Sequence, residues 1–252
     1  MKSYAILLAA GTGLRTGLSI PKQLAKIKDK EIILHSLEIF TKSTINFDAV
    51  IIATPPSSVF DFNWGEFFKK NIAGGTLKKL HIITGGRARQ DSVGNSIKYL
   101  ESILPASETE TAIVFIHDSA RPFVKDEELS SLLALTAAHG AAFLCSLASE
   151  TIKEVSKEVN FDKLILSNPL KLKTLKRDNL ISAKTPQAFK FNIIKKAFDA
   201  AARTNFVSTD DISLVENLGL PVVPVLSTDF NIKITSALDI EIAELLYDKF
   251  KP

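Results

Sequence analysis

The amino-acid sequence predicts an α/β fold in which a mostly parallel sheet carries helices on both faces. Short apolar runs, rich in β-branched or aromatic residues and bounded by turn residues, indicate buried strands. Longer segments between them have apolar residues at helical spacing. This alternation is typical of parallel strands joined by crossover helices. At 252 residues, we expect a single domain over residues 1–252.

Each expected element can be given a range. The predicted strands are Tyr4–Leu8, Ala49–Ala53, His81–Thr84, Ala112–Ile116, Ala141–Leu147 and Val222–Leu226. The predicted helices cover 32–40, 93–104, 129–135 and 240–250. The weakly polar stretch 132–148 is too short and too polar to span a membrane, which takes about 20 predominantly apolar residues. We predict there a helix that stops at His139-Gly140 and a buried strand after it, and no membrane association.

One region breaks this rhythm. From Thr151 to about Ala183 the residues are polar, basic and strand-like, with Asn168-Pro169 as a turn and no helical period. Such a segment buries little apolar surface on its own core, so the entropy lost in ordering it must be offset elsewhere. We therefore predict an extended β-arm over residues 149–183 that contacts a second copy of the chain.

Composition excludes several classes of protein. Lys and Arg number 31 against 28 Asp and Glu, and this net charge of +3 is too mild for a protein that mainly binds nucleic acid. The apolar stretch after Lys2 is short for a secretory signal and runs directly into a glycine loop. The single cysteine, Cys145, excludes an internal disulfide and a cysteine-based zinc site. We expect a cytoplasmic protein without a nucleic-acid partner.

The loop after the first predicted strand is the first candidate for ligand binding, because α/β sheets bind ligands at the carboxyl ends of their strands. It reads Ala9-Ala10-Gly11-Thr12-Gly13-Leu14-Arg15-Thr16-Gly17, followed by Pro21-Lys22-Gln23. The third glycine comes one position too late for a dinucleotide fingerprint, and no Walker A motif is present. An ordinary strand-to-helix turn would explain the glycines alone. Arg15 and Lys22 beside them suit a triphosphate that is being cleaved.

Two further polar motifs follow predicted strands. Gly85-Gly86 lets a flat base or a phosphate lie close to the backbone, and Ser92 stands at a helix start, where it caps the helix or binds a ligand. Asp118 leaves the end of a buried strand and is suited to hold Mg²⁺, with an Asp118–Arg121 ion pair as the alternative. We assign His117 to packing, because the sequence offers it no metal partner.

A series of short motifs runs along the whole chain. They are Ala-Ala-Gly-x-Gly-x-Arg with Pro-Lys-Gln, Gly-Gly-x-x-Arg-x-x-Ser-Val, His-Asp-x-Ala-Arg-Pro-Phe, Thr-Pro-Gln-x-Phe (185–189), Thr-Asp-Asp (209–211) and Asn-Ile-Lys-Ile-Thr (231–235). In this order they resemble the motifs of the 2-C-methyl-D-erythritol 4-phosphate cytidylyltransferases of the non-mevalonate isoprenoid pathway.

The resemblance implies a Rossmann-like nucleotidyltransferase sheet whose arm crosses to a second subunit of a homodimer. It also implies Mg²⁺-dependent transfer of CMP from CTP to 2-C-methyl-D-erythritol 4-phosphate, with 4-diphosphocytidyl-2-C-methyl-D-erythritol and pyrophosphate as products. Arg15 and Lys22 would stabilise the transition state at the α-phosphate. The residues that would bind CTP are Ala9, Ala10, Gly11, Gly86, Ser92 and Ser119. The polyol phosphate would be bound by Asp118, which also serves Mg²⁺, Arg121, Thr185 and Lys233, and by Thr151 and Arg177 of the other subunit's arm.

Other functions compete with this one. A ribitol 5-phosphate cytidylyltransferase has the same motif set, although Ala9-Ala10 and residues 91–93 favour methylerythritol phosphate by resemblance. A catalytically silent nucleotide-binding protein would not need Arg15, Lys22 and two further charged residues, Asp118 and Lys233, together. The misplaced glycine counts against an NAD-linked dehydrogenase. The sequence departs from the family's usual pattern in a longer arm, and in an arginine at position 87 where many relatives have an acidic residue.

Overall fold

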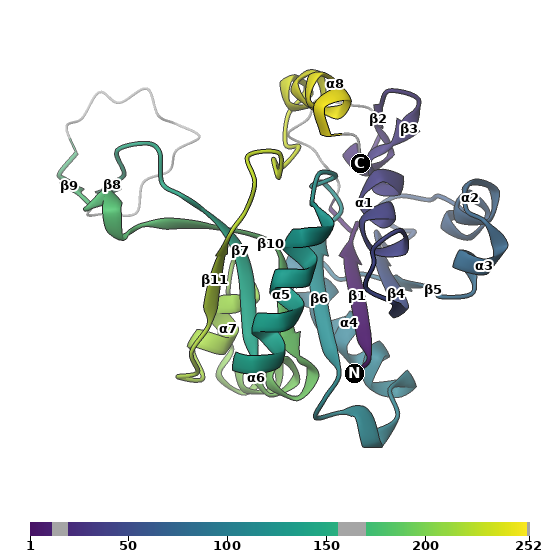
Figure 1. Ribbon diagram of the computed structural model, residues 1–252, viewed down its shortest axis with the longest axis horizontal. Helices are drawn as coiled ribbons and strands as arrows, with labels where there is room; N and C mark the ends of the chain where they lie inside the picture. Colours follow the sequence, from purple (N-terminus) through teal and green to yellow (C-terminus); the bar gives the residue numbers. More distant parts are fainter. Residues whose placement is uncertain (12–19, 156–169, 251–252) are drawn as a thin grey trace.

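The computed structural model describes residues 1–11, 20–155 and 170–250, and shows a central sheet with helices on both sides and an arm that projects from it (Figure 1). The main sheet has seven strands in the order β11-β7-β10-β6-β1-β4-β5. They are β1 (Ser3–Leu8), β4 (Phe47–Thr54), β5 (Leu80–Thr84), β6 (Ile113–Asp118), β7 (Ala141–Leu147), β10 (Ile181–Lys190) and β11 (Val223–Leu226). Neighbours are parallel except that β10 runs antiparallel to β6 and β7. The predicted α/β fold with a mostly parallel sheet is confirmed.

Most of the described helices cover the two faces of this sheet, whereas the C-terminal helix packs in a third cluster with Ile27 and Phe123. The α-helices are α1 (Ile32–Thr41), α2 (Trp64–Asn71), α3 (Gly74–Leu77), α4 (Arg89–Ile103), α5 (Asp126–His139), α6 (Phe191–Thr204), α7 (Ile212–Glu216) and α8 (Ala237–Phe250). The 3-10 helices are η2 (Lys22–Leu24), η3 (Ala106–Glu108) and η5 (Arg177–Asn179), and β2 (Lys26–Ile27) pairs with β3 (Lys30–Glu31). Helices α4, α6 and α7 share one hydrophobic cluster with the sheet, and α1, α2 and α5 share the other.

The core lies on both faces because successive residues of a strand point to opposite sides of the sheet. In β1, Ile6 packs into the cluster of α4 and α6, whereas Leu7 packs into the cluster of α1 and α5, and both are fully buried. Burial of such a side chain stabilises the fold by roughly 1.5–3 kcal/mol. Strands buried on both faces are apolar throughout, and this pattern made them recognisable in the sequence.

The predicted break in the stretch 132–148 is also present. Helix α5 ends at His139, Gly140 takes a φ of 96°, and β7 begins at Ala141. This positive φ favours glycine at position 140, because residues with a Cβ rarely adopt it. Within the described parts of the chain, no helix combines the length and the apolar character needed to cross a bilayer.

Strand β10 was not predicted, and neither were α2, α6 and α7. β10 starts inside the polar stretch at Ile181 and contains Pro186, which lacks the N–H that a central strand needs. The structure accommodates the proline by a shift in the β7–β10 register between Ala183 and Gln187. The last residues of the predicted arm, 181–183, therefore already pair with β7.

The arm leaves the main sheet after β7 and returns as β10 (Figure 1). Its strands β8 (Lys153–Val155) and β9 (Leu172–Thr174) pair antiparallel with each other in a separate two-stranded sheet. The expected turn at Asn168-Pro169 lies outside the described residues. β9 begins at Leu172, shortly after it. The side chains of Ile152 and Leu172 are 39% and 56% exposed, so the arm leaves apolar surface uncovered in this chain.

Candidate active site

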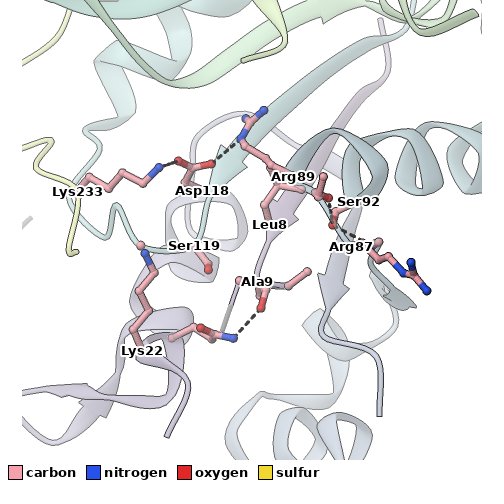
Figure 2. A pocket seen from close by; sticks show the side chains of 15 residues that line it. Leu8, Ala9, Lys22, Arg87, Arg89, Ser92, Asp118, Ser119 and Lys233 are labelled. Carbon is pink, nitrogen blue, oxygen red and sulfur yellow. Dashed lines mark hydrogen bonds and ion pairs between the residues drawn. The ribbon is translucent and has the colours of Figure 1, made fainter. Parts of the chain in front are cut away.

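A cavity of about 310 Å³ opens at the carboxyl ends of the strands, next to the ends of β1, β5 and β6. Its wall is formed by residues 8–11, 22–23, 86–89 and 118–120, with Ser92 and Lys233. The predicted site residues Ala9, Ala10, Gly11, Lys22, Gly86, Ser92, Asp118, Ser119 and Lys233 all line it. Figure 2 shows Lys22 on one side of the cavity and Asp118 and Lys233 on another. Arg15, the other predicted catalytic cation, lies outside the described residues.

The first wall is the backbone that follows β1. Ala9 donates its N–H to Ala53 O at 2.8 Å, and the buried Gln23 side chain donates to Ala9 O at 2.6 Å. Gln23 belongs to η2, which begins after Pro21. The Pro-Lys-Gln motif therefore fixes the loop after β1 through the Gln23 side chain. The same short helix carries Lys22, whose ammonium donates to Ile234 O at 3.1 Å. The cation is thus held at the cavity by a backbone carbonyl from the far end of the chain.

The second wall is the glycine pair after β5. A Cβ at Gly86 would lie 2.1 Å from Asp91 Cβ, and one at Gly85 would lie 2.6 Å from Ala10 Cβ, so only glycine fits. Ser92 Oγ accepts from Gly86 N–H at 3.0 Å and donates to Ala88 O at 3.1 Å. The hydroxyl of Ser92 therefore shapes this loop, and it brings the backbone to the edge of the cavity where a flat base can lie against it.

The third wall is Asp118, at the end of β6. Its carboxylate pairs with Lys233 Nζ at 2.6 Å and with Arg89 Nε at 3.3 Å (Figure 2). Arg89 also pairs with Asp211 at 2.8 Å. Burial favours the neutral acid, but the adjacent Arg89 and Lys233 cations outweigh it and hold the pKa of Asp118 below its ordinary value. Among the described residues no ion pair joins Asp118 to Arg121, so that alternative interpretation is wrong.

Arg89 lines the cavity, although nothing in the sequence indicated its role. It is the arginine of the Gly-Gly-x-x-Arg motif and the first residue of α4. Its two carboxylate partners, Asp118 and Asp211, lie far away in the sequence, and burial lowers its pKa less than these carboxylates raise it. With Lys22 and Lys233, it gives the cavity a positive field suited to a polyphosphate. Arg87 reaches the cavity edge but points away from Asp118 (Figure 2).

Arg121 and Thr185, predicted to bind the polyol phosphate, do not line the cavity but lie behind Asp118. Arg121 donates to Asn231 O at 3.2 Å, and its Nε is buried without a partner among the described residues. Thr185 Oγ1 accepts from Asp118 N–H at 3.1 Å and contacts His117 Nδ1 at 3.0 Å. Both substrate assignments remain predictions.

The sequence predicted only a packing role for His117, but its ring also makes two polar contacts. Its side chain is fully buried, and its Nε2 lies 2.9 Å from Arg121 O in addition to the contact of Nδ1 with Thr185. Burial lowers the pKa of His117 to about 4, so the imidazole is neutral at ordinary pH.

Thr151 and Arg177 lie on the arm, and neither lines the cavity of its own chain. Arg177 is exposed in η5 and donates to Ser149 O at 3.2 Å. Both residues remain predicted contacts of a second subunit.

Asp118 is the only carboxylate among the described residues that line the cavity. The described parts of the chain contain no group of three or more His, Cys, Asp or Glu side chains placed to hold a metal ion. Any divalent cation here would need most of its ligands from a substrate.

Comparisons with known proteins agree with the motifs and the fold. The family model of 2-C-methyl-D-erythritol 4-phosphate cytidylyltransferase matches residues 3–249. The proteins of that name from Clostridioides difficile strain 630 and Caldicellulosiruptor bescii are 36% and 35% identical, over 98% and 99% of this chain and 94% and 99% of their own. The crystal structure of the Francisella tularensis protein of that name is similar with a TM-score of 0.74 and 30% identity, covering 97% of this chain and 99% of that one. This chain therefore belongs to the 2-C-methyl-D-erythritol 4-phosphate cytidylyltransferase family.

Proposed function

We propose that the cavity at the ends of β1, β5 and β6 is where this chain transfers CMP from CTP to 2-C-methyl-D-erythritol 4-phosphate. The products are 4-diphosphocytidyl-2-C-methyl-D-erythritol and pyrophosphate. The observation that carries the assignment is the meeting, in one cavity, of the glycine loops and Lys22 with the ion-paired Arg89, Asp118 and Lys233. Simple nucleotide binding would not need Lys22, Arg89, Asp118 and Lys233 together.

CTP lies between the two glycine loops in this proposal. The Ala9–Gly11 backbone and the loop held by Ser92 form the base and phosphate contacts. Ser119, at the same cavity, has its backbone tied to Leu8 O at 3.0 Å and to Ser36 Oγ at 2.7 Å, so its position is fixed before CTP arrives. Preorganised donors of this kind need no rearrangement when charge develops on the substrate.

The reaction joins an oxygen of the methylerythritol phosphate to the α-phosphorus of CTP and breaks the bond from that phosphorus to the bridging oxygen, so pyrophosphate leaves. A phosphate monoester has a second pKa near 6 and is largely dianionic at pH 7, so the nucleophile needs no general base. Lys22, together with Arg15, stabilises the charge on the α-phosphate and on the leaving oxygen. Lys233, held by Asp118, orients the attacking phosphate.

We propose Mg²⁺ as the metal of this reaction. The donor set suits it, because magnesium in proteins is commonly held by one or two carboxylates and by substrate phosphates. Asp118 would be its protein ligand, and its more distant contact with Arg89, at 3.3 Å, leaves lone pairs on that carboxylate. When bound, the ion neutralises charge on the triphosphate.

We also infer a homodimer in which Thr151 and Arg177 reach the other subunit's cavity. The arm carries these residues away from their own cavity and leaves Ile152 and Leu172 uncovered, which supports a partner of the same kind. A cytoplasmic location stays a prediction, and the buried, unpaired Cys145 is compatible with it.

The direct test is pyrophosphate release with each nucleoside triphosphate and each polyol phosphate in the presence and absence of Mg²⁺. We expect CTP with methylerythritol phosphate to be fastest, ribitol 5-phosphate to be much poorer, and activity to be lost on chelation. If ribitol phosphate were turned over as efficiently, the acceptor would be wrong and the reaction class would stand. If chelation left the rate unchanged, the metal proposal would be overturned.

A further inference from the structure

We infer that a buried ring of hydrogen bonds behind Asp118, closed by His117, positions the half of the site that receives the acceptor substrate. This inference rests on the proposed function of the cavity. It makes His117 a positioning residue and gives Thr185 the same role through its hydroxyl group.

The ring joins three segments that are distant in sequence, the turn 117–121 and the segments that carry Thr185 and Asn231. Its bonds run from His117 Nε2 to Arg121 O (2.9 Å), from Arg121 Nη1 to Asn231 O (3.2 Å), from Asn231 Nδ2 to Thr185 O (3.0 Å), and from Thr185 Oγ1 back to His117 Nδ1 (3.0 Å). Asn231 and His117 are fully buried and Thr185 is nearly so, which keeps water from competing for these bonds.

The direction of each bond around His117 follows from its partners. A backbone carbonyl only accepts, so the nitrogen facing Arg121 O carries the proton. The neutral ring then has a lone pair on Nδ1, and Thr185 Oγ1 must donate to it. The same hydroxyl accepts from Asp118 N–H at 3.1 Å. Its only proton is therefore committed inside the protein and cannot serve a substrate.

The ring holds the backbone on both sides of the acceptor site. It binds the turn 118–121 through Asp118 N and Arg121 O, and Ile234 N–H ties the same turn to the loop 231–235 by donating to Ala120 O at 2.9 Å. That loop carries Lys233, and Ile234 O accepts from Lys22. None of the hydrogen bonds of the ring reaches the segment 85–92 where cytosine is proposed to lie. The ring touches that segment indirectly, through the longer Arg89–Asp118 contact of 3.3 Å.

Loss of the ring should affect the acceptor substrate and CTP differently. Loosening the ring shifts Asp118 and Lys233 relative to the α-phosphate, and misplacement by about 1 Å can cost on the order of 10² in rate. Loss of the ring should therefore lower kcat and raise the KM for methylerythritol phosphate, while the Kd for CTP stays within about threefold. A residue that only supports the fold would change both substrates in parallel or neither.

Paired substitutions separate the bonds of the ring. Thr185→Val removes the hydroxyl at nearly constant volume, and Thr185→Ser keeps it. His117→Asn keeps a polar atom near the position of Nδ1, whereas His117→Gln keeps one near Nε2. We expect Thr185→Val and both His117 variants to lower kcat/KM for methylerythritol phosphate by about 10- to 100-fold, and Thr185→Ser to stay within about threefold of wild type. Because they lose the same bond, His117→Gln and Thr185→Val should be less than additive when combined.

His35 provides the matched control. It is also buried, its Nε2 lies 3.0 Å from Ile27 O, and its ring meets Tyr247 edge-on at 5.2 Å, but it is absent from the cavity wall. His35→Gln should lower Tm as the His117 variants do and leave the kinetics of the folded enzyme unchanged. Nitrogen-15 NMR of histidine-labelled wild-type protein gives a readout independent of activity, and should show His117 protonated on Nε2 alone.

The outcomes distinguish this inference from the function on which it rests. An inactive wild type with methylerythritol phosphate would refute the function. An active wild type whose folded Thr185→Val and His117 variants keep their acceptor kinetics would overturn the positioning role, as would equal losses for CTP or a Thr185→Ser variant as poor as Thr185→Val. A proton on His117 Nδ1 would reverse the hydrogen-bond directions and overturn the ring as described.

Discussion

The cavity and the arm carry similar charged residues in opposite settings. Around the cavity, Lys22, Lys233 and Arg89 are each tied to a carbonyl or a carboxylate. On the arm, Lys173 pairs with Glu154 at 3.4 Å while 75% of its side chain stays exposed, and exposed pairs of this kind contribute little to stability. The cavity is thus preorganised within one chain. In the proposed homodimer, the arm holds its functional groups for use by a second molecule.

The largest effect is expected for Lys22→Ala, which removes a cation of the cavity. Removing a preorganised cation aimed at the transition state should lower kcat by on the order of 10²–10³, with a smaller effect on CTP binding, and Arg15→Ala should behave in the same way. Lys79 is the control, because it also donates to a backbone carbonyl, Phe47 O at 2.9 Å, but lies away from the cavity. Lys79→Ala should keep the wild-type kcat. If Lys22→Ala lost only CTP affinity, its catalytic role would be wrong.

Mixing two inactive subunits tests whether the arm works in trans. If Arg177 completes the other subunit's cavity, Arg177→Ala and Lys22→Ala damage different halves of a composite site. A heterodimer then has one site with both lesions and one intact site, so random exchange should restore about one quarter of wild-type activity. Verified heterodimers that stay as inactive as the parents, or an active monomer, would reassign Arg177 to its own subunit or to structure.

The apolar surface at the base of the arm should matter for association more than for folding. Leu147 and Ile181 are paired across β7 and β10 and are 66% and 46% exposed. Leu147→Asp should shift the protein towards monomer in analytical ultracentrifugation while Tm changes by no more than about 4 °C, because surface substitutions usually change the free energy of unfolding by about 0.5 kcal/mol or less. Val207→Asp, at a position 82% exposed away from the arm, is the control and should stay as dimeric as wild type.

The smallest expected effect comes from comparing Asp126, the partly exposed first residue of α5, with an acid of the arm. Asp126 accepts from Ser43 and Thr44; burial opposes ionisation, but these hydrogen bonds outweigh it and lower the pKa of Asp126. Because the folded pKa is depressed, this stability is present above pH 4 or so, where the unfolded acid is ionised, and is lost as pH falls through the folded pKa. Asp126→Asn should therefore lower Tm slightly at pH 7 and not at pH 2, whereas Glu154→Gln on β8 should change Tm at neither. Equal shifts at both pH values would show that ionisation is not the cause.

The sequence predicted the parts of this molecule that depend on local spacing. The central strands were found because residues such as Ile6 and Leu7 are buried on both faces and leave a continuous apolar run. Lys22 was recognised as a candidate because it follows a glycine-rich loop, and it lines the cavity. β10 was missed because Pro186 and a polar start argue against a strand, and only the shift in register makes room for them.

The missed parts of the site depend on contacts between distant segments. Arg89 was left without a role because its partners Asp118 and Asp211 are 29 and 122 residues away. The sequence indicated only packing for His117, because no other histidine stands at a metal-ligand spacing from it. Its partner Thr185 comes from β10, the strand that the sequence did not indicate.

The arm begins and ends at neighbouring strands, so its length can vary without moving its two ends apart. Leu147 and Ile181 face each other in the ladder, so the main sheet itself holds the two ends of the excursion together. Doubling the length of a flexible loop with fixed ends costs only about 0.6 kcal/mol. Changes in the length of the arm between these two positions should therefore cost the main sheet little stability. The length and sequence of the arm can therefore change to suit a different partner surface while the cavity on the main sheet is preserved.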